Sequence, residues 1–388
     1  MLSKNIKFKN FSKKKKNLPD NKNFKILKKN YKNKKLKILQ ILSNEYKKSY
    51  NKKILNKYKN FQNYKIIGMG GSILGIKAIY QFLKHKIKKN FFFVDSLQTT
   101  LDLHKKKTVN LIISKSGKTL ETIFNSNILI NNKKNIFITE NKNNYLNILA
   151  NRLKADVVEH KNYIGGRYSV LSEVGMLPAE LMGLNEKKFK RLNYLINNKI
   201  FTTNLVNNVN SILSMINRKK YISVILNYDH KSENLFSWYQ QLIAESLGKK
   251  SKGIIPLVST MPKDNHSLMQ LYLDGPRNSF YTFFSVLEKN SVKINNKYLL
   301  ESHYYLKNKR LNEIINAQIR ATQNVFNRKK MPFRSFEILK RNEESLGEIF
   351  CFFILEVILL GRALNVNPFD QPSVELIKKE TKKILLSN

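Results

Sequence analysis

Short apolar runs alternate with amphipathic stretches along most of this 388-residue chain, which predicts strands separated by helices. Buried strands are expected at residues 65–67, 91–94, 109–113, 136–139 and 156–159, with helices between them and a last one over 171–182. A second block begins near residue 205, with strands at 221–226, 254–258 and 280–286 and helices over 232–247, 306–326 and 346–364. This alternation predicts an α/β protein with two domains, each a mostly parallel sheet flanked by helices.

The first 63 residues differ from the rest because they are rich in lysine and asparagine and hold only Asp20 and Glu45 as acidic residues. We expect a frayed, solvated start of about thirty residues, which includes a pure lysine run at 13–16. One amphipathic helix is predicted over 36–58. The predicted organisation is a basic extension over 1–63, a first domain over 64–203 and a second over 204–388 with C-terminal helices.

The charge balance is extreme, with 71 basic against 27 acidic residues and a formal net charge of +44. Such an excess suggests a nucleic-acid or membrane partner. Only 11 of these residues are arginine, however, and lysine, asparagine, isoleucine, phenylalanine and tyrosine are all residues of A/T-rich codons. The excess is spread along the chain and no nucleic-acid-binding motif accompanies it. We therefore expect no specific nucleic-acid partner, and a polyanion-binding protein ranks third among the functional alternatives.

Cys351 is the only cysteine, and it lies in an apolar helical run where a core thiol is expected rather than a nucleophile. The absence of an intrachain disulfide fits a reducing compartment. The same run, residues 349–360, contains Glu356 and is too short to span a bilayer. With no apolar segment typical of an export signal at the N-terminus, the sequence predicts a cytoplasmic protein without a membrane partner.

A phosphate-binding turn is predicted where the strand at 109–113 passes into the helix at 123–130. The turn reads Ser114-Lys115-Ser116-Gly117-Lys118-Thr119. Backbone N–H groups at a helix start are unpaired, and the helix dipole favours negative charge there. Small hydroxyl residues, a glycine and lysines at such a place are typical of a phosphate site.

A second turn, over residues 68–72, carries three glycines and Ser72 after the strand at 65–67. The dinucleotide fingerprint is broken there, because Ile73 stands where a third glycine or alanine is needed and Asp95 comes a little late. A glycine turn without any ligand explains this pattern equally well. Both turns are expected at the carboxyl edge of the first sheet, where ligands bind in open α/β folds.

Four further segments carry candidate chemistry. Arg167 stands between a Gly-Gly turn and a helix start, and an arginine in a lysine-saturated chain suggests a need for a planar charged fork, although a surface arginine is the plain alternative. The other three would each pass alone as solvated surface. They are the helix end from Gln241 through Glu245 to Lys249, the loop around His266, and the stretch from Phe369 through Gln371 to Lys378.

Together, in order and spacing, these segments resemble the glucose-6-phosphate isomerase family in its shorter bacterial form, from about Ile66 to Lys379. The Gly-Arg-Tyr-Ser loop and the Glu-Ser-x-Gly-Lys helix end are specific to that family. The serine–lysine turn is shared by sugar isomerase domains generally. The resemblance implies two sugar isomerase domains and no metal, nucleotide or other cofactor.

The resemblance also implies residue roles. Glu245 would move a proton between C1 and C2, and Arg167 would stabilise the enediolate. His266, from the partner subunit of a homodimer, and Lys378 would open the sugar ring. Phosphate would be held by Ser114, Lys115, Ser116 and Thr119, and the sugar by Gly71, Ser72, Gln241 and Gln371. A carboxylate paired with an electrophile is also what proton transfer beside a carbonyl requires.

The implied reaction interconverts glucose 6-phosphate and fructose 6-phosphate through a cis-enediol. Two alternatives stay open: a related isomerase that also accepts mannose 6-phosphate, and a non-catalytic sugar-phosphate sensor of the same fold. Departures from the family pattern are few. Pro372, Ser373 and Ile377 replace bulky or glycine residues, and Lys118 adds a cation beside the phosphate turn. Pro372 could shift Lys378.

Overall fold

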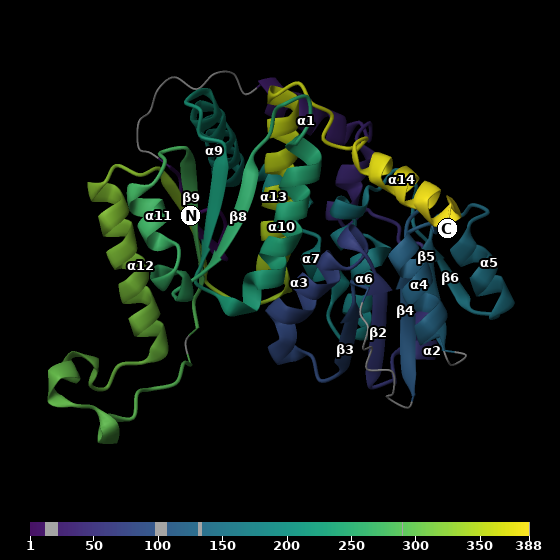
Figure 1. Ribbon diagram of the computed structural model, residues 1–388, viewed down its shortest axis with the longest axis horizontal. Coiled ribbons are helices and arrows are strands. Elements are labelled where there is room, and N and C mark those ends of the chain that lie inside the picture. Colours follow the sequence, from purple (N-terminus) through teal and green to yellow (C-terminus); the bar gives the residue numbers. More distant parts are fainter. Residues whose placement is uncertain (12–21, 98–106, 131–133, 289, 388) are drawn as a thin grey trace.

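Two five-stranded sheets, each flanked by helices, form the framework of the chain (Figure 1). The computed structural model describes residues 1–11, 22–97, 107–130, 134–288 and 290–387. The predicted α/β class with two mostly parallel sheets is confirmed. The lysine run at 13–16, part of the start that was expected to be frayed, lies outside the described residues.

The first sheet is entirely parallel, with the strand order β3-β2-β4-β5-β6. Its central strands are buried along almost their whole length, as expected of a sheet covered on both faces. The strands are β2 (Asn63–Gly68), β3 (Asn90–Val94), β4 (Thr108–Ile113), β5 (Asn135–Thr139) and β6 (Asp156–Glu159). The helices of this half are α2 (Lys52–Tyr58), α3 (Leu74–Leu83), α4 (Leu120–Leu129), α5 (Tyr145–Arg152), α6 (Glu173–Leu181), α7 (Glu186–Phe189) and α8 (Leu192–Asn197).

The second sheet has the order β1-β10-β9-β7-β8 and is parallel except for β1, which pairs antiparallel with β10. Its strands are β1 (Ile6–Lys9), β7 (Ile222–Asn227), β8 (Ile255–Thr260), β9 (Ser279–Val286) and β10 (Phe333–Ile338). The remaining helices are α1 (Lys22–Lys32), α9 (Lys199–Asn217), α10 (Glu233–Leu247), α11 (Met269–Asp274), α12 (Leu311–Arg328), α13 (Glu343–Ala363) and α14 (Val374–Ser387). The proposed domain boundary at 203/204 falls inside α9.

Helices α10 and α13 pack between the two halves, where α10 contacts α3 of the first half (Figure 1). Helix α13 is buried on nearly all sides, and Asn342 caps its first turn by accepting a hydrogen bond from the Ser345 N–H at 2.9 Å. Cys351 lies inside this helix as the expected core thiol, and burial raises its pKa to about 12. Across the described ranges, no helix combines the length and apolar character needed to cross a bilayer.

The expected fraying of the N-terminus is wrong for residues 1–11. Leu2 and Ile6 are fully buried, β1 extends the second sheet, and the hydroxyl of Ser3 and the amide of Asn5 both donate to the Glu348 carboxylate, at 2.6 and 2.9 Å. The single helix expected over 36–58 is also wrong, because the segment forms a 3₁₀ turn over Lys37–Leu42 and then α2. The first segment is held in place by partners more than 300 residues further along the chain. The local sequence pattern does not reveal such distant partners.

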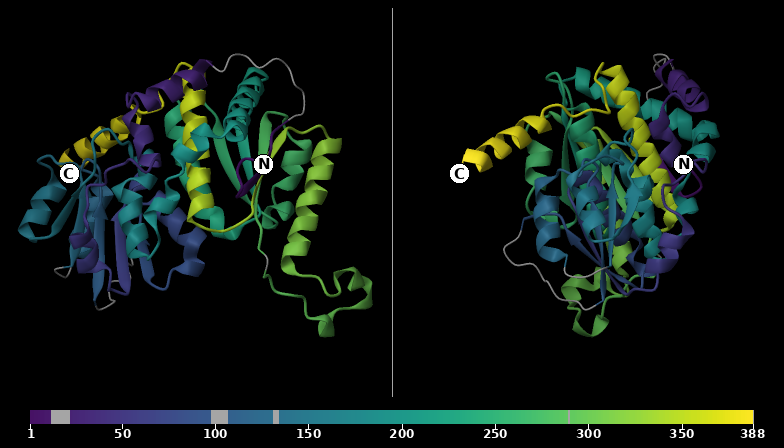
Figure 2. Two further views of the ribbon diagram at one scale, coloured as in Figure 1. Left: turned by 180° about the vertical axis from the view of Figure 1, so that it is seen from behind. Right: turned by 90° about the vertical axis from the view of Figure 1, so that its right-hand side faces the viewer.

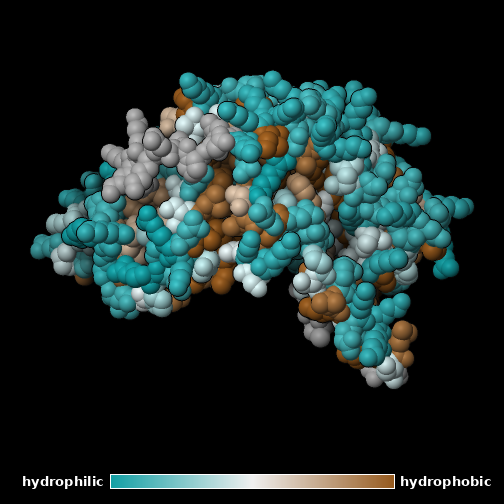
Figure 3. All heavy atoms as spheres, turned by 90° about the horizontal axis from the view of Figure 1, so that it is seen from above, coloured by the Kyte–Doolittle hydropathy of each residue, from teal (hydrophilic) through white to brown (hydrophobic). Residues whose placement is uncertain are grey.

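Hydrophilic side chains cover most of the face seen in Figure 3, across elements of both halves, and apolar side chains show there in separate patches. Inside the molecule, two fully buried charged groups form a pair. The guanidinium of Arg334 on β10 forms an ion pair with Glu356 on α13, and both side chains are fully buried. Arg334 also donates to Thr282 and Asn208, at 2.9 and 2.7 Å, and Tyr239 donates to Glu356 at 3.0 Å. This network joins the sheet to α9, α10 and α13.

We predict that Glu356→Ala lowers the free energy of unfolding by about 3–5 kcal/mol, because it leaves the buried Arg334 charge without a partner. Glu337→Ala is the matched control. It removes the carboxylate of an exposed pair with Lys7, 3.2 Å apart, and should cost less than about 1 kcal/mol. Denaturant unfolding of both variants measures the difference. Equal losses would show that the buried pair contributes no more than a surface one.

Candidate active site

The buried guanidinium of Arg167 is the centre of the predicted site. It lies in a 3₁₀ turn over Gly166–Leu171, and its side chain has no exposed surface. Its nitrogens donate to five acceptors from two distant segments: Ser246 Oγ (2.7 Å), Glu245 Oε2 (3.1 Å), Gln371 Oε1 (2.7 Å), the Pro368 carbonyl (2.6 Å) and the Asp370 carbonyl (3.0 Å). Arg167 therefore joins distant segments of the chain as well as carrying a positive charge. This use of all its donors fits the planar charged fork that the scarcity of arginine suggested.

Glu245 lies near the end of α10, and each of its carboxylate oxygens has a fixed partner. Oε2 accepts from Arg167, and Oε1 accepts from the Gln241 amide at 2.8 Å. Gln241 stands four residues earlier on the same helix, so the two side chains lie on one face. The Glu245 side chain is 28% exposed, so a ligand can reach the carboxylate.

The glycine turn after β2 contacts both of these elements. A Cβ on Gly71 would lie 2.1 Å from the backbone carbon of Gly166, and a Cβ on Gly70 would lie 2.8 Å from the Gln241 amide nitrogen. Gly70 also has φ +51°, a conformation that side chains disfavour. The glycines are thus needed for close approach, and they bring Gly71 and Ser72 beside Gln241 and the Arg167 loop.

The Ser114–Thr119 turn follows β4, next to β2 in the parallel sheet, so both turns share the carboxyl edge. The hydroxyls of Ser114 and Thr119 lie 2.9 Å apart. No side chain caps the start of α4, so no side chain occupies the place where its first N–H groups would bind an anion. Ser116 is exposed at the turn.

Lys115 lies differently from its neighbours in the turn. Its ammonium group donates to the Asn162 carbonyl at 2.6 Å and lies 3.6 Å from the Glu140 carboxylate. Burial lowers its pKa. In this conformation Lys115 links the phosphate turn to the loop that leads into Arg167.

Two predicted residues are not brought to the Arg167–Glu245 pair. His266 is exposed in a 3₁₀ turn after β8. Strand β8 runs parallel to β7, so both strands end near the beginning of α10. His266 follows β8 and therefore lies near the opposite end of α10 from Glu245, on the order of 20 Å away at 1.5 Å per helical residue. Lys378 lies on α14, which projects from the body (Figure 2), and its ammonium pairs with Glu375 at 2.6 Å.

Sequence reasoning missed several groups that shape the site. The Pro368 and Asp370 carbonyls that bind Arg167 are backbone atoms, which no residue pattern reveals. Ser246 and Tyr168, whose hydroxyls lie 2.9 Å apart, stand next to predicted residues in the family-specific segments, which was the available signal. Within the described ranges, no group of three His, Cys, Asp or Glu side chains could hold a metal ion.

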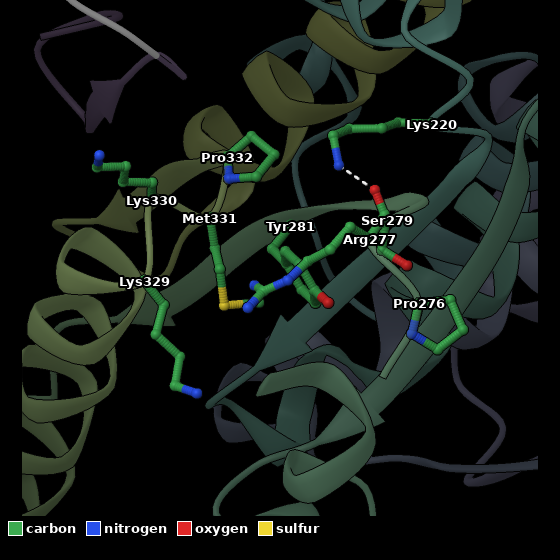
Figure 4. A pocket seen from close by; sticks show the side chains of 9 residues that line it. All are labelled: Lys220, Pro276, Arg277, Ser279, Tyr281, Lys329, Lys330, Met331 and Pro332. Atoms are coloured by element: carbon green, nitrogen blue, oxygen red, sulfur yellow. Dashed lines mark hydrogen bonds between the residues drawn. The ribbon is translucent and has the colours of Figure 1, made fainter. Parts of the chain in front are cut away.

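A cavity of about 240 Å³ lies elsewhere, at the amino ends of β7, β9 and β10 (Figure 4). Lys220, Arg277, Lys329 and Lys330 line it, together with Tyr281 and Met331. Another, of about 230 Å³, lies between α12 and the sheet. None of the predicted site residues lines either cavity.

Two mostly parallel sheets, with a hydroxyl-rich turn at the carboxyl edge of the first, give the chain the fold seen in sugar isomerases. Comparison with known families narrows this, because the phosphoglucose isomerase model matches residues 20–388. The chain belongs to the phosphoglucose isomerase family.

Named relatives support this membership, and a solved structure shares the fold. The chain is 32% identical to the glucose-6-phosphate isomerase of Methanocaldococcus jannaschii, over 81% of this chain and 82% of that one. It is 31% identical to a probable glucose-6-phosphate isomerase of Methanococcus maripaludis, over 87% and 79%. The fold resembles a hypothetical protein from Thermus thermophilus, with a TM-score of 0.80 and 23% identity over 94% of this chain and 93% of that one.

We predict that Arg167→Lys lowers kcat/KM in an isomerase assay by about 100-fold or more, because an ammonium group with three donors cannot reproduce the planar five-bond arrangement. Arg152→Lys is the matched control, since Arg152 is exposed in the last turn of α5. If both variants retained full activity, the guanidinium geometry would be irrelevant to the site.

Proposed function

We propose that the chain interconverts glucose 6-phosphate and fructose 6-phosphate through a cis-enediolate. The observation that carries this proposal is the Glu245 carboxylate, partly exposed and held by Arg167 at 3.1 Å and by Gln241 at 2.8 Å. A carboxylate and a fixed guanidinium are the pair that a proton shift beside a carbonyl needs. The names of the relatives and the family match support the same substrates.

In the proposed reaction, Glu245 takes the proton from C2 of the open-chain aldose and returns it to C1. The electron pair of the broken C2–H bond forms the C1=C2 double bond, and the carbonyl π electrons move onto O1 as negative charge. A proton then passes from the O2 hydroxyl to O1, which moves the negative charge to O2, and the carbonyl at C2 forms as C1 takes up its proton. Arg167 stabilises that charge through its own fixed positive charge and without reorganising, because all five of its N–H donors are already held by protein acceptors. Reversal of the same steps converts the ketose to the aldose.

Phosphate would bind at the turn after β4. Its ligands would be the hydroxyls of Ser114, Ser116 and Thr119, the first N–H groups of α4, and Lys115 if its ammonium leaves Asn162. The glycine turn, with Gly71 and Ser72, would lie against the sugar together with Gln241 and Gln371. The Arg167–Glu245 pair favours an enzyme over the sensor alternative, because a sensor needs no positioned base. Acceptance of mannose 6-phosphate stays open.

Glu245→Gln should reduce kcat by at least about 100-fold while sugar-phosphate binding persists, since positioned proton transfer contributes that much or more. Glu233→Gln, the same change in the exposed first turn of the same helix, is the control. A coupled assay from fructose 6-phosphate gives the rates, and equilibrium binding gives the affinity. Near-normal turnover of the Glu245 variant would remove it from the mechanism.

We further propose that the active site is completed by a second copy of the chain. His266 and Glu245 lie toward opposite ends of α10 within one chain, on the order of 20 Å apart. A two-fold dimer repeats every contact twice, so the exposed His266 of each copy can serve the Glu245 of the other. Ring opening, by His266 and Lys378, would then depend on assembly.

Coexpressed Glu245→Gln and His266→Ala chains should regain activity that neither has alone. In each mixed dimer one site carries both changes and the other carries none, so activity per mixed dimer should approach half of the wild-type value. Native mass measurement verifies that mixed dimers form. Mixed dimers without activity would mean that both residues serve the same site from one chain.

A further inference from the structure

The phosphate turn, residues Ser114–Thr119, is hydrogen-bonded to the carboxyl end of β5, the neighbouring strand. The Lys115 carbonyl accepts two hydrogen bonds there, from the Glu140 N–H at 3.0 Å and from the Thr139 hydroxyl at 3.2 Å. Both donors belong to residues that Asn144 in turn holds. We propose that Asn144 is a positioning residue for phosphate binding, an inference that rests on the proposed function of the turn.

Asn144 is 5% exposed, and its side-chain amide is fully used. Its Nδ2 donates to the Thr139 hydroxyl at 3.2 Å and to the Glu140 carbonyl at 3.3 Å. Its Oδ1 accepts from the Asn147 N–H at 3.0 Å and so caps α5. One side chain thus fixes the strand end that binds the Lys115 carbonyl and the helix that follows.

The same amide also packs against the turn itself. Gly117 has φ +63°, and a Cβ built on it would lie 2.1 Å from Asn144 Oδ1. Asn144 therefore occupies the space that any side chain at 117 would need. The Gly117 N–H donates to the Ser114 carbonyl at 3.2 Å and closes the turn. The Asn144 side chain sets where the Gly117 backbone can lie.

A purely structural role would be limited to capping α5, and one substitution separates the two roles. Serine is also a favoured N-cap residue, so Asn144→Ser keeps the cap but removes both the amide donor and the atom that packs against Gly117. Asn51 caps α2 in the same way, accepting from the N–H groups of Lys53 and Ile54 at 3.0 and 3.2 Å. Asn51→Ser is therefore the matched control.

We expect Asn144→Ser to raise the KM for fructose 6-phosphate and the competitive inhibition constant of inorganic phosphate together, each by about 10-fold, the loss expected of one ordinary interaction. The turnover number should change less than about threefold, because phosphate is held equally in ground and transition states. The melting temperature should fall further for Asn144→Ser than for Asn51→Ser, because Asn144 is buried and loses both bonds of its Nδ2 whereas Asn51 is exposed. Both variants should stay folded at the assay temperature, and the kinetic constants of Asn51→Ser should equal those of the wild type.

A double-mutant cycle tests the contact directly. Gly117→Ala should weaken phosphate binding in the wild-type background, where the new Cβ meets Asn144 Oδ1. In the Asn144→Ser background the same change should cost less, because that atom is gone, although the strain of φ +63° remains. Non-additive losses would support the contact.

The possible results separate this inference from the function on which it rests. If phosphate inhibits the wild type competitively and Asn144→Ser leaves both constants unchanged, the positioning role is refuted while the phosphate turn stands. Strictly additive losses in the cycle would also refute it. If phosphate does not compete with fructose 6-phosphate in the wild type, the assignment of the turn fails, and the inference fails with it.

Discussion

The buried guanidinium of Arg167 is the constraint on which the site depends. It joins three segments that are far apart in sequence: its own loop, the end of α10, and the stretch at 368–371. A fully buried charge is costly unless every donor is satisfied, so its five acceptors must keep their places. Glu245, the proposed base, is one of those acceptors. The geometry of the site and the packing between the halves are therefore set by the same bonds.

Lysines and arginines occupy different kinds of position in this chain. Lysines supply most of its +44 formal charge and mostly remain at the surface, whereas arginines take the two most demanding buried positions, Arg167 and Arg334. A guanidinium can satisfy several acceptors in a plane and keeps its charge when buried. Lys190 shows the contrast: burial lowers its pKa to about 8, although two backbone carbonyls accept from it.

The fold could be predicted where the signal was local. All the expected strands form, because each carries apolar or β-branched residues between turn residues. Strands β1 and β10 were missed because their sequences mix charges with apolar residues. The charge of Arg334 in β10 is balanced by Glu356, 22 residues away, which the local sequence does not reveal. For the site, sequence reasoning named Glu245 and Gln371, which meet at Arg167, but not Ser246. It could not give the backbone carbonyls or the bond between Lys115 and Asn162.

Within one chain, some of the proposed site residues are held by buried contacts and others are not. The groups proposed for the enediolate step, Glu245 and Arg167, are fixed by buried contacts, whereas those proposed for ring opening lie on exposed elements. Helix α14, which carries Lys378, has no buried residue, and Ile377 beside it is 72% exposed. An amphipathic helix gains most of its stability by covering its apolar face, so α14 has a strong drive to dock. Docking would move Lys378, just as a second chain would supply His266. In the proposed mechanism, a single chain would thus hold the groups for proton transfer in place, and ring opening would depend on assembly.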